Sequence, residues 1–335
     1  MTIPNKTQLV SSELGNLWLA YQEKTMLMKF LEHFLEHTEN EETQQMLQRS
    51  YDLSAQSVIQ IRSFFEQAGA VIPVGFTDGD IHKGAPKLFD YTFDVMFLHL
   101  MSKIEVALFS LHSTMSYRLD VFEFFRQLSA DAQETYRQTT QYLLQVGVLS
   151  RPPYVSMPKE VEIVNNKSYF SGYSLLNEKR ALNTIEVSLI HHAIEANLTG
   201  MQLMMGFAQV AHDKQVKKYF ADGMDLSKKV ETTLGEFFRE EFIEPPATHA
   251  GKATNSTFAP FSDKMMMYIT SLLSTFGLGS NAIGGAFSLR NDLPLTMSFL
   301  AKDMVSFAKE GGKIMVANGW MEEPPQVEDR KQLRK

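Results

Sequence analysis

The chain has 335 residues, 44% of them hydrophobic, which is long enough for one large domain or two ordinary domains with buried cores. Its 32 Lys and Arg against 39 Asp and Glu give a net charge of −7. This balance disfavours a nucleic-acid-binding or anionic-membrane surface, because both require clustered positive charge. The absence of cysteine excludes disulfides, thiolate nucleophiles and cysteine-based metal centres.

The N-terminal sequence contains no basic region followed by an apolar run, so we predict no secretory signal. We also find no uninterrupted 18-residue apolar stretch of the kind that spans a membrane, and we predict no membrane span. The composition is therefore typical of a soluble, cytoplasmic protein.

Four helices are predicted in the first half of the chain. Apolar residues recur at three- and four-residue steps over 7–37, over 41–68 and over 88–115, which is the spacing of amphipathic helices. The fourth predicted helix starts at Asp120, interpreted as an N-cap with Glu123 completing a capping box, and ends near Gly147.

The lengths of the links between these helices predict a topology. The first and second helices, and the third and fourth, are joined by short links and should lie antiparallel. The link of about 17 residues after residue 68 is rich in Gly, Pro and Asp. It can span roughly 56 Å, more than the roughly 42 Å of a 28-residue helix. One long crossover between helices two and three is the ferritin-like arrangement of a four-helix bundle.

The second half of the chain repeats the first at a constant offset, the one that relates SYRLD at 116–120 to SLRND at 288–292. Other pairs related by this offset are Glu23 and Glu195, Phe65 and Phe237, Pro73 and Pro245, Gly79 and Gly251, Phe89 and Phe261, and Gly147 and Gly319. A period this long indicates two whole domains. We predict an all-α tandem pair of ferritin-like bundles: copy one over 1–150, a linker over 151–174, copy two over 175–325 and a charged tail over 326–335.

Several motifs also resemble a family of two-repeat proteins of unknown function from spore-forming bacteria. They are ELGNLWLAY (13–21), FFEQAGAVIPVGFTDGDI (64–81), APKLFDYTF (85–93), RPPYV (151–155), PFSDKMMMY (260–268) and NGWMEEPPQVEDRK (318–331). The resemblance covers nearly the whole chain and implies ferritin-like helical bundles. Some members carry a spore-coat label, which implies spore association and spore-coat proteins as partners. The resemblance supplies no catalytic residues.

The chain lacks the di-iron signature of ferritin-like oxidases. That site needs a Glu from each of two helices and a Glu-x-x-His motif from each of the other two. None of the nine histidines has a Glu three residues before it. We therefore predict no enzymatic activity and expect no cofactor.

Two weaker sets of candidate metal ligands are present. Glu105 and His112 are two turns apart on one face of the third helix, and Glu23 could approach them across the bundle. His191 and Glu195 are four residues apart in copy two. Carboxylates with imidazole could hold Fe, Mn or Zn, although such pairs more often form boundary hydrogen bonds.

Copy two has Gly277 and Gly284 at the positions of Glu105 and His112, so a duplicated metal site is excluded there. The glycines are consistent either with close helix packing or with a cavity, and both interpretations remain open. The 19 methionines are interpreted as flexible core fillers.

Two further groups are interpreted as structural. His33 and His37, with Glu32 and Glu36, are predicted to form a surface cluster where the helix dipole favours positive charge. The Arg-x-Asp motifs at 118–120 and 290–292 are expected to clamp a crossover or the other bundle. We predict a non-catalytic structural or protein-interaction protein, with a degenerate metal- or small-ligand-binding bundle as the alternative.

Overall fold

The computed structural model describes residues 8–172, 179–248 and 250–334. Its elements are α1 (Ser11–His37), α2 (Glu41–Ala68), η1 (Asp78–Asp80), α3 (Phe93–Thr114), α4 (Leu119–Gln145), η2 (Lys167–Phe170), α5 (Thr184–Val210), α6 (Lys214–Glu240), α7 (Asp263–Phe287) and α8 (Asp292–Ala317). No β-strand occurs within these ranges, and the predicted all-α class is confirmed.

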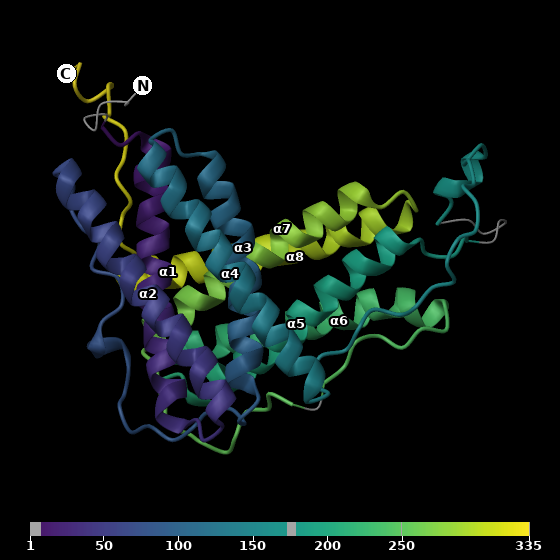
Figure 1. Cartoon of the computed structure of the whole chain (residues 1–335), viewed down its shortest axis with the longest axis horizontal. Coiled ribbons are helices and arrows are strands. Elements are labelled where there is room, and N and C mark those ends of the chain that lie inside the picture. The colour runs from purple at the N-terminus through teal and green to yellow at the C-terminus, as the bar shows by residue number, and fades with distance from the viewer. Residues whose placement is uncertain (1–7, 173–178, 249, 335) are drawn as a thin grey trace.

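The helices form two bundles, as the duplication predicts. In bundle one, α1 packs on α2 and α3 on α4; in bundle two, α5 packs on α6 and α7 on α8. Figure 1 shows the bundles diverging from a shared base, with bundle two extending away from bundle one. A long crossover joins the second and third helices of each bundle, over 69–92 and 241–262.

The helix ends follow local signals at most positions. Asn40 caps α2 by accepting a hydrogen bond from the Thr43 backbone N–H at 2.9 Å. Gly69 ends α2 with φ +65°, a left-handed conformation that glycine adopts without steric cost.

The predicted N-cap at Asp120 is wrong. Helix α4 starts one residue earlier, with Arg118 at the N-cap position. Asp120 accepts hydrogen bonds from the Arg118 guanidinium at 3.1 and 2.7 Å. In bundle two, Arg290 Nε likewise donates to Asp292 Oδ1 at 2.9 Å. Each carboxylate is held by the guanidinium two residues before it, so it does not cap its helix.

The first helices of the two copies correspond at an offset that is larger by one than the predicted offset. Glu13 accepts hydrogen bonds from the backbone N–H groups of Tyr117 and Arg118. Glu186 does the same for the backbone N–H groups of residues 289 and 290. By this register Ala196 is the counterpart of Glu23, and the predicted equivalence of Glu23 and Glu195 is wrong.

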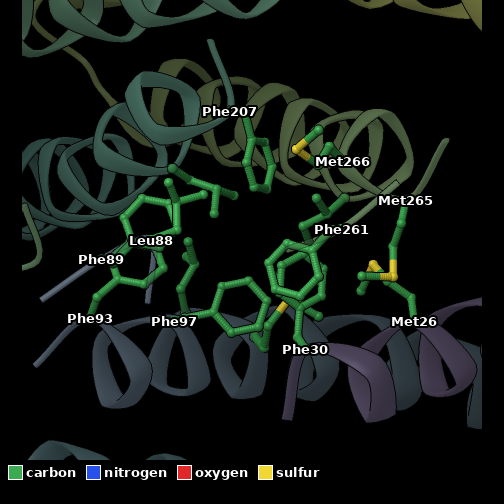
Figure 2. Close-up of a cluster of buried hydrophobic side chains, with 14 of the residues drawn as sticks. Met26, Phe30, Leu88, Phe89, Phe93, Phe97, Phe207, Phe261, Met265 and Met266 are labelled. Carbon is green, nitrogen blue, oxygen red and sulfur yellow. The ribbon is translucent and has the colours of Figure 1, made fainter. Parts of the chain in front are cut away.

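A single hydrophobic cluster crosses from one bundle into the other. The Phe30 ring centroid lies 4.7 Å from that of Phe97 in α3 and 4.2 Å from that of Phe261 in the second crossover. Figure 2 shows Phe207 and Met266 of the second half facing this group. Each bundle also has a separate apolar cluster farther from the junction. The shared cluster makes the two bundles one packed unit.

The two crossovers run antiparallel against each other at this junction. Isolated β-bridges join Ile81 to Phe261 and Phe89 to Ala253. His82 N–H donates to the Pro260 carbonyl at 2.9 Å, and Thr254 N–H donates to the Leu88 carbonyl at 2.8 Å. Buried backbone groups need partners, and these loops supply them to each other.

The flanking residues extend the same pairing. Asp90 N–H donates to the Lys252 carbonyl, and Ser262 N–H donates to the Asp80 carbonyl, both at 2.9 Å. The Asp90 carboxylate also accepts from the Gly251 and Lys252 backbone N–H groups. These bonds explain why α3 begins at Phe93 and not near residue 88, where the apolar pattern starts.

Among the described residues, α3 is the helix that is long and apolar enough to cross a membrane. However, 67% of its most apolar 18-residue window is buried inside the protein. We assign α3 to the shared core, since a central core helix has the same composition as a membrane span.

We predict that Phe261→Ala lowers the free energy of unfolding by about 3–5 kcal/mol, because it leaves a void between the bundles. Calorimetry should give one unfolding transition for the wild-type chain, since both bundles share the core. Phe299→Ala is the matched control; its side chain is 62% exposed, and the change should cost under about 0.5 kcal/mol. Equal losses in the two variants would contradict this account.

Candidate functional site

The centre of bundle one holds a buried lysine between the two predicted carboxylates. Glu23 and Glu105 are 3% and 7% exposed. Lys24 Nζ lies 2.5 Å from Glu105 Oε1 and 3.8 Å from Glu23 Oε2. The ammonium therefore supplies the positive charge between these two carboxyl groups. Sequence reasoning missed Lys24, since a lysine next to a buried Glu gives no sign that it also points inward.

Burial and the neighbouring charges shift the pKa values of Glu23 and Lys24. Burial raises the pKa of Glu23 well above its usual range; the Lys24 charge opposes this shift and the Glu105 charge adds to it. Burial lowers the pKa of Lys24, but the two carboxyl groups outweigh this effect and the net pKa is raised. Burial and the neighbouring Glu105 charge therefore both disfavour the charged form of Glu23.

His112 does not join this cluster. It lies two turns from Glu105, and its ring packs on Phe125 at a centroid distance of 5.1 Å. Burial lowers the pKa of His112 to about 4. Within the described residues, Glu23, Glu105 and His112 do not form a group with converging donor atoms. The structure thus brings two of these three candidates together, with Lys24 between them.

Glu195 joins the two bundles. Its Oε1 accepts from His99 Nε2 at 3.1 Å and from Lys103 Nζ at 3.0 Å, both on α3. Burial raises the pKa of Glu195, but the His99 hydrogen bond and the Lys103 charge outweigh it and lower the pKa to about 2. The predicted partner, His191, lies 3.9 Å away, beyond hydrogen-bond distance. Sequence reasoning missed His99 and Lys103, because they come from the other copy.

The His99 ring is oriented from both sides. Its Nδ1 lies 3.2 Å from the Thr139 hydroxyl, and the ring stacks on Tyr136 at a centroid distance of 4.7 Å. This support fixes Nε2 toward Glu195, so the polar group acts as an anchor between the bundles.

Bundle two has a cavity where bundle one has its ion pair. By the register of the first helices, Asn197 stands at the position of Lys24. By the predicted offset, Gly277 stands at the position of Glu105. Both Asn197 and Gly277 border a cavity of about 70 Å³. The corresponding space in bundle one is about 20 Å³ and is lined by Lys24 and Glu105. Where copy one has the ion pair, copy two therefore has a mostly apolar cavity.

Both sequence-based interpretations of the copy-two glycines are correct, each at a different position. Gly277 borders the cavity, and a Cβ added there would first meet Met304 Cε at 3.9 Å. At Gly284 an added Cβ would lie 2.9 Å from Met297 Sδ, closer than normal contact. Gly284 therefore permits close helix packing.

The sequence predicted His33 on the surface, and this prediction is wrong, because the residue is only 2% exposed. Burial lowers its pKa to about 3, and the charges of His37 and Lys87 act in the same direction. One donor atom each from His33, Glu36 and His37 lie within 4.8 Å of one another. Lys87 and Leu88 of the first crossover line a small pocket with His33, and Phe261 of the second crossover packs on its ring; helical periodicity cannot predict these neighbours.

The expected clamping contact is made by one of the two Arg-x-Asp motifs, the one at 290–292; the Arg118 side chain pairs with Asp120. The Arg290 side chain is fully buried, and its Nη1 donates to the Arg180 carbonyl at 2.9 Å and to Glu241 Oε1 at 3.1 Å. It thereby ties the second crossover to the segment that enters α5. The Arg118–Asp120 pair lies closer to solvent.

Comparison with known proteins gives a family match and a structural similarity. A family described as "Protein of unknown function (DUF3231)" matches residues 1–161 and again 170–333. No curated protein matches the chain. A crystal structure of a "putative spore coat protein" from Bacillus halodurans C-125 is similar, at 19% identity and a TM-score of 0.43. The similarity covers 45% of this chain and 98% of that chain.

We predict that Lys24→Ala lowers the free energy of unfolding by about 3–5 kcal/mol, because it leaves Glu105 buried without its countercharge. Urea denaturation measures this change. The control is Lys218→Ala, which breaks an exposed 2.6 Å pair with Asp222 and should cost under about 1 kcal/mol. A Lys24 variant as stable as the control would exclude the buried ion pair.

Proposed function

The chain belongs to the DUF3231 family of proteins of unknown function, and from that premise we propose that it is a non-catalytic structural protein that binds other proteins. The connector between the bundles, defined as residues 151–172, is the observation that carries this proposal. It runs from the end of α4 to the far end of bundle two (Figure 1), where Asn291 N–H donates to the Phe170 carbonyl at 3.1 Å.

The connector exposes an unusual amount of apolar surface. Tyr154 and Val161 are each 87% exposed, Ile163 is 78% exposed and Met157 is 74% exposed. Single exposed apolar residues are ordinary, but a run of them in so short a segment is typical of a surface that another protein covers.

The backbone of the connector also has N–H and C=O groups that can form hydrogen bonds with a partner. Over 151–165 no backbone hydrogen bond to another described residue is present. Val161 and Ile163 alternate with Glu160 and Glu162, so an extended chain places the two apolar side chains on one face. Such a segment can add as a strand to a sheet edge. The partner that fits is a protein with an unpaired strand edge flanked by basic residues.

In this proposal the two bundles form a rigid frame that holds the connector. The shared core and the paired crossovers hold both halves together, and Lys24 supplies a positive charge beside Glu105. The proposal therefore assigns no cofactor to the centre of bundle one.

We further propose that the protein is cytoplasmic and associates with spores, with spore-coat proteins among its partners. The resemblance of the sequence motifs to a family in which some members carry a spore-coat label supports the spore association, and the composition supports the cytoplasmic location.

We expect a photo-crosslinking residue at Val161 to form one defined protein adduct in sporulating cells. The same residue at Val305, which is 50% exposed on α8, is the control and should form none. Adding Ile163→Glu should remove the adduct, because it places a charge on the apolar face. Identical adducts from both positions, or none from Val161, would contradict the proposal.

A second candidate function rests on the cavity in bundle two. Its volume of about 70 Å³ is roughly half that of an engineered apolar cavity that takes benzene or xenon. Phe276, Met304 and Phe307 contribute apolar walls. The cavity therefore fits only a very small apolar ligand, and xenon is the appropriate probe.

We predict that Gly277→Ala weakens xenon binding, because the new methyl group enters the cavity. Gly312→Ala is the matched control: it is another glycine inside a helix, and an added Cβ meets nothing within 4 Å. Both changes should stabilise the chain by about 1 kcal/mol through helix propensity. An unchanged ¹²⁹Xe shift in the Gly277 variant would exclude the cavity as the binding site.

A further inference from the structure

The last turns of α1 bring three potential metal ligands together outside the centre of either bundle. His33, Glu36 and His37 stand at positions i, i+3 and i+4, which share one face of a helix. One donor atom from each lies within 4.8 Å of the other two. Within the described residues this is the group of three whose donor atoms converge in this way.

The first crossover orients two of these ligands. His37 Nε2 lies 2.8 Å from the Ala85 carbonyl oxygen. A carbonyl can only accept, so Nε2 carries the proton and Nδ1 keeps a free lone pair. Glu36 Oε1 accepts from the Gly84 backbone N–H at 3.1 Å, which leaves the second carboxylate oxygen available. Metal-ligating side chains are commonly fixed by this kind of outer hydrogen bond.

The third ligand is a buried imidazole with an unused nitrogen. His33 is 2% exposed, and its Nδ1 has no hydrogen-bond partner among the described residues. A buried polar atom without a partner costs about 1–3 kcal/mol. The Phe261 ring packs edge-on against His33 at a centroid distance of 5.2 Å and limits its movement.

One positive charge lies nearby and is neutralised locally. Lys87 lines the same small pocket as His33 and His37, but its Nζ is held by the buried Asp94 carboxylate at 2.9 Å. The repulsion that Lys87 would exert on a cation is therefore offset by Asp94.

We propose that His33, Glu36 and His37 bind one divalent transition-metal ion at the C-terminal end of α1. Two imidazoles and one carboxylate suit Zn²⁺ or Fe²⁺ and do not suit Mg²⁺ or Ca²⁺, which prefer oxygen ligands. Three protein donors leave a coordination position for water. The ion would tie the end of α1 to the first crossover through the Ala85 and Gly84 contacts.

The test uses the full chain, prepared with chelator and then dialysed free of it. Co²⁺ absorption reports the coordination geometry, and calorimetric titration with Zn²⁺ gives stoichiometry and affinity. We expect one ion per chain, with at least about tenfold weaker binding in His37→Ala and in Glu36→Gln. Both side chains are less buried than His33, so both variants should fold, which circular dichroism checks.

The matched control is His212→Ala, because His212 is an exposed histidine outside the cluster. It should bind Zn²⁺ as the wild-type chain does. Absence of Zn²⁺ and Co²⁺ binding to the wild-type chain would overturn the proposal. Binding that is unchanged in folded His37→Ala and Glu36→Gln would also overturn it.

Discussion

The pairing of the two crossovers is the interaction on which the rest of the structure depends. A long irregular segment cannot be buried unless its backbone N–H and C=O groups find partners. Each crossover finds them on the other, and their aromatic side chains then meet α1 and α3 in the shared cluster. Because this pairing sets the junction of the bundles, it also brings Glu195 of α5 to His99 and Lys103 of α3.

The two bundles differ in the residues that occupy their centres. Bundle one keeps polar groups there and satisfies them with a lysine that is almost completely buried. Such an ion pair contributes little net stability, since desolvation offsets much of the Coulomb attraction. Bundle two has no ion pair at this position and contains a cavity there. Neither arrangement reproduces the carboxylate and histidine set of a di-iron centre.

The sequence predicted the fold well because helix periodicity and loop length are local properties. The end of α1 and both ends of α2 agree with the prediction, and a glycine marks the end of α2; α1 begins at Ser11, later than the predicted start at residue 7. Prediction failed where a residue's surroundings come from elsewhere in the chain. Lys24 looks like a surface lysine until its environment in the bundle is known, and His33 lies against residues of both crossovers, which are beyond the whole of α2 in the sequence.

Prediction of the candidate sites failed for the same reason. Glu195 carries a histidine one turn before it that suggests a local pair, yet its closer partners lie on α3. The assumed equivalence of Glu23 and Glu195 failed because one extra residue shifts the first helix of copy two. A gapless offset detects duplication reliably, but it cannot align side chains across such an insertion.

The contacts between the two crossovers are symmetric, and this symmetry indicates how the two-repeat chain arose. Residue 81 pairs with 261 and residue 89 pairs with 253, and each of these pairs becomes the other when the two halves are exchanged at the offset of the repeat. This is the reciprocal pattern of an isologous homodimer interface, here contained within one polypeptide. In a true homodimer every substitution occurs twice. Fusion removes that constraint, so the two halves can differ at their centres, as the ion pair of one and the cavity of the other do.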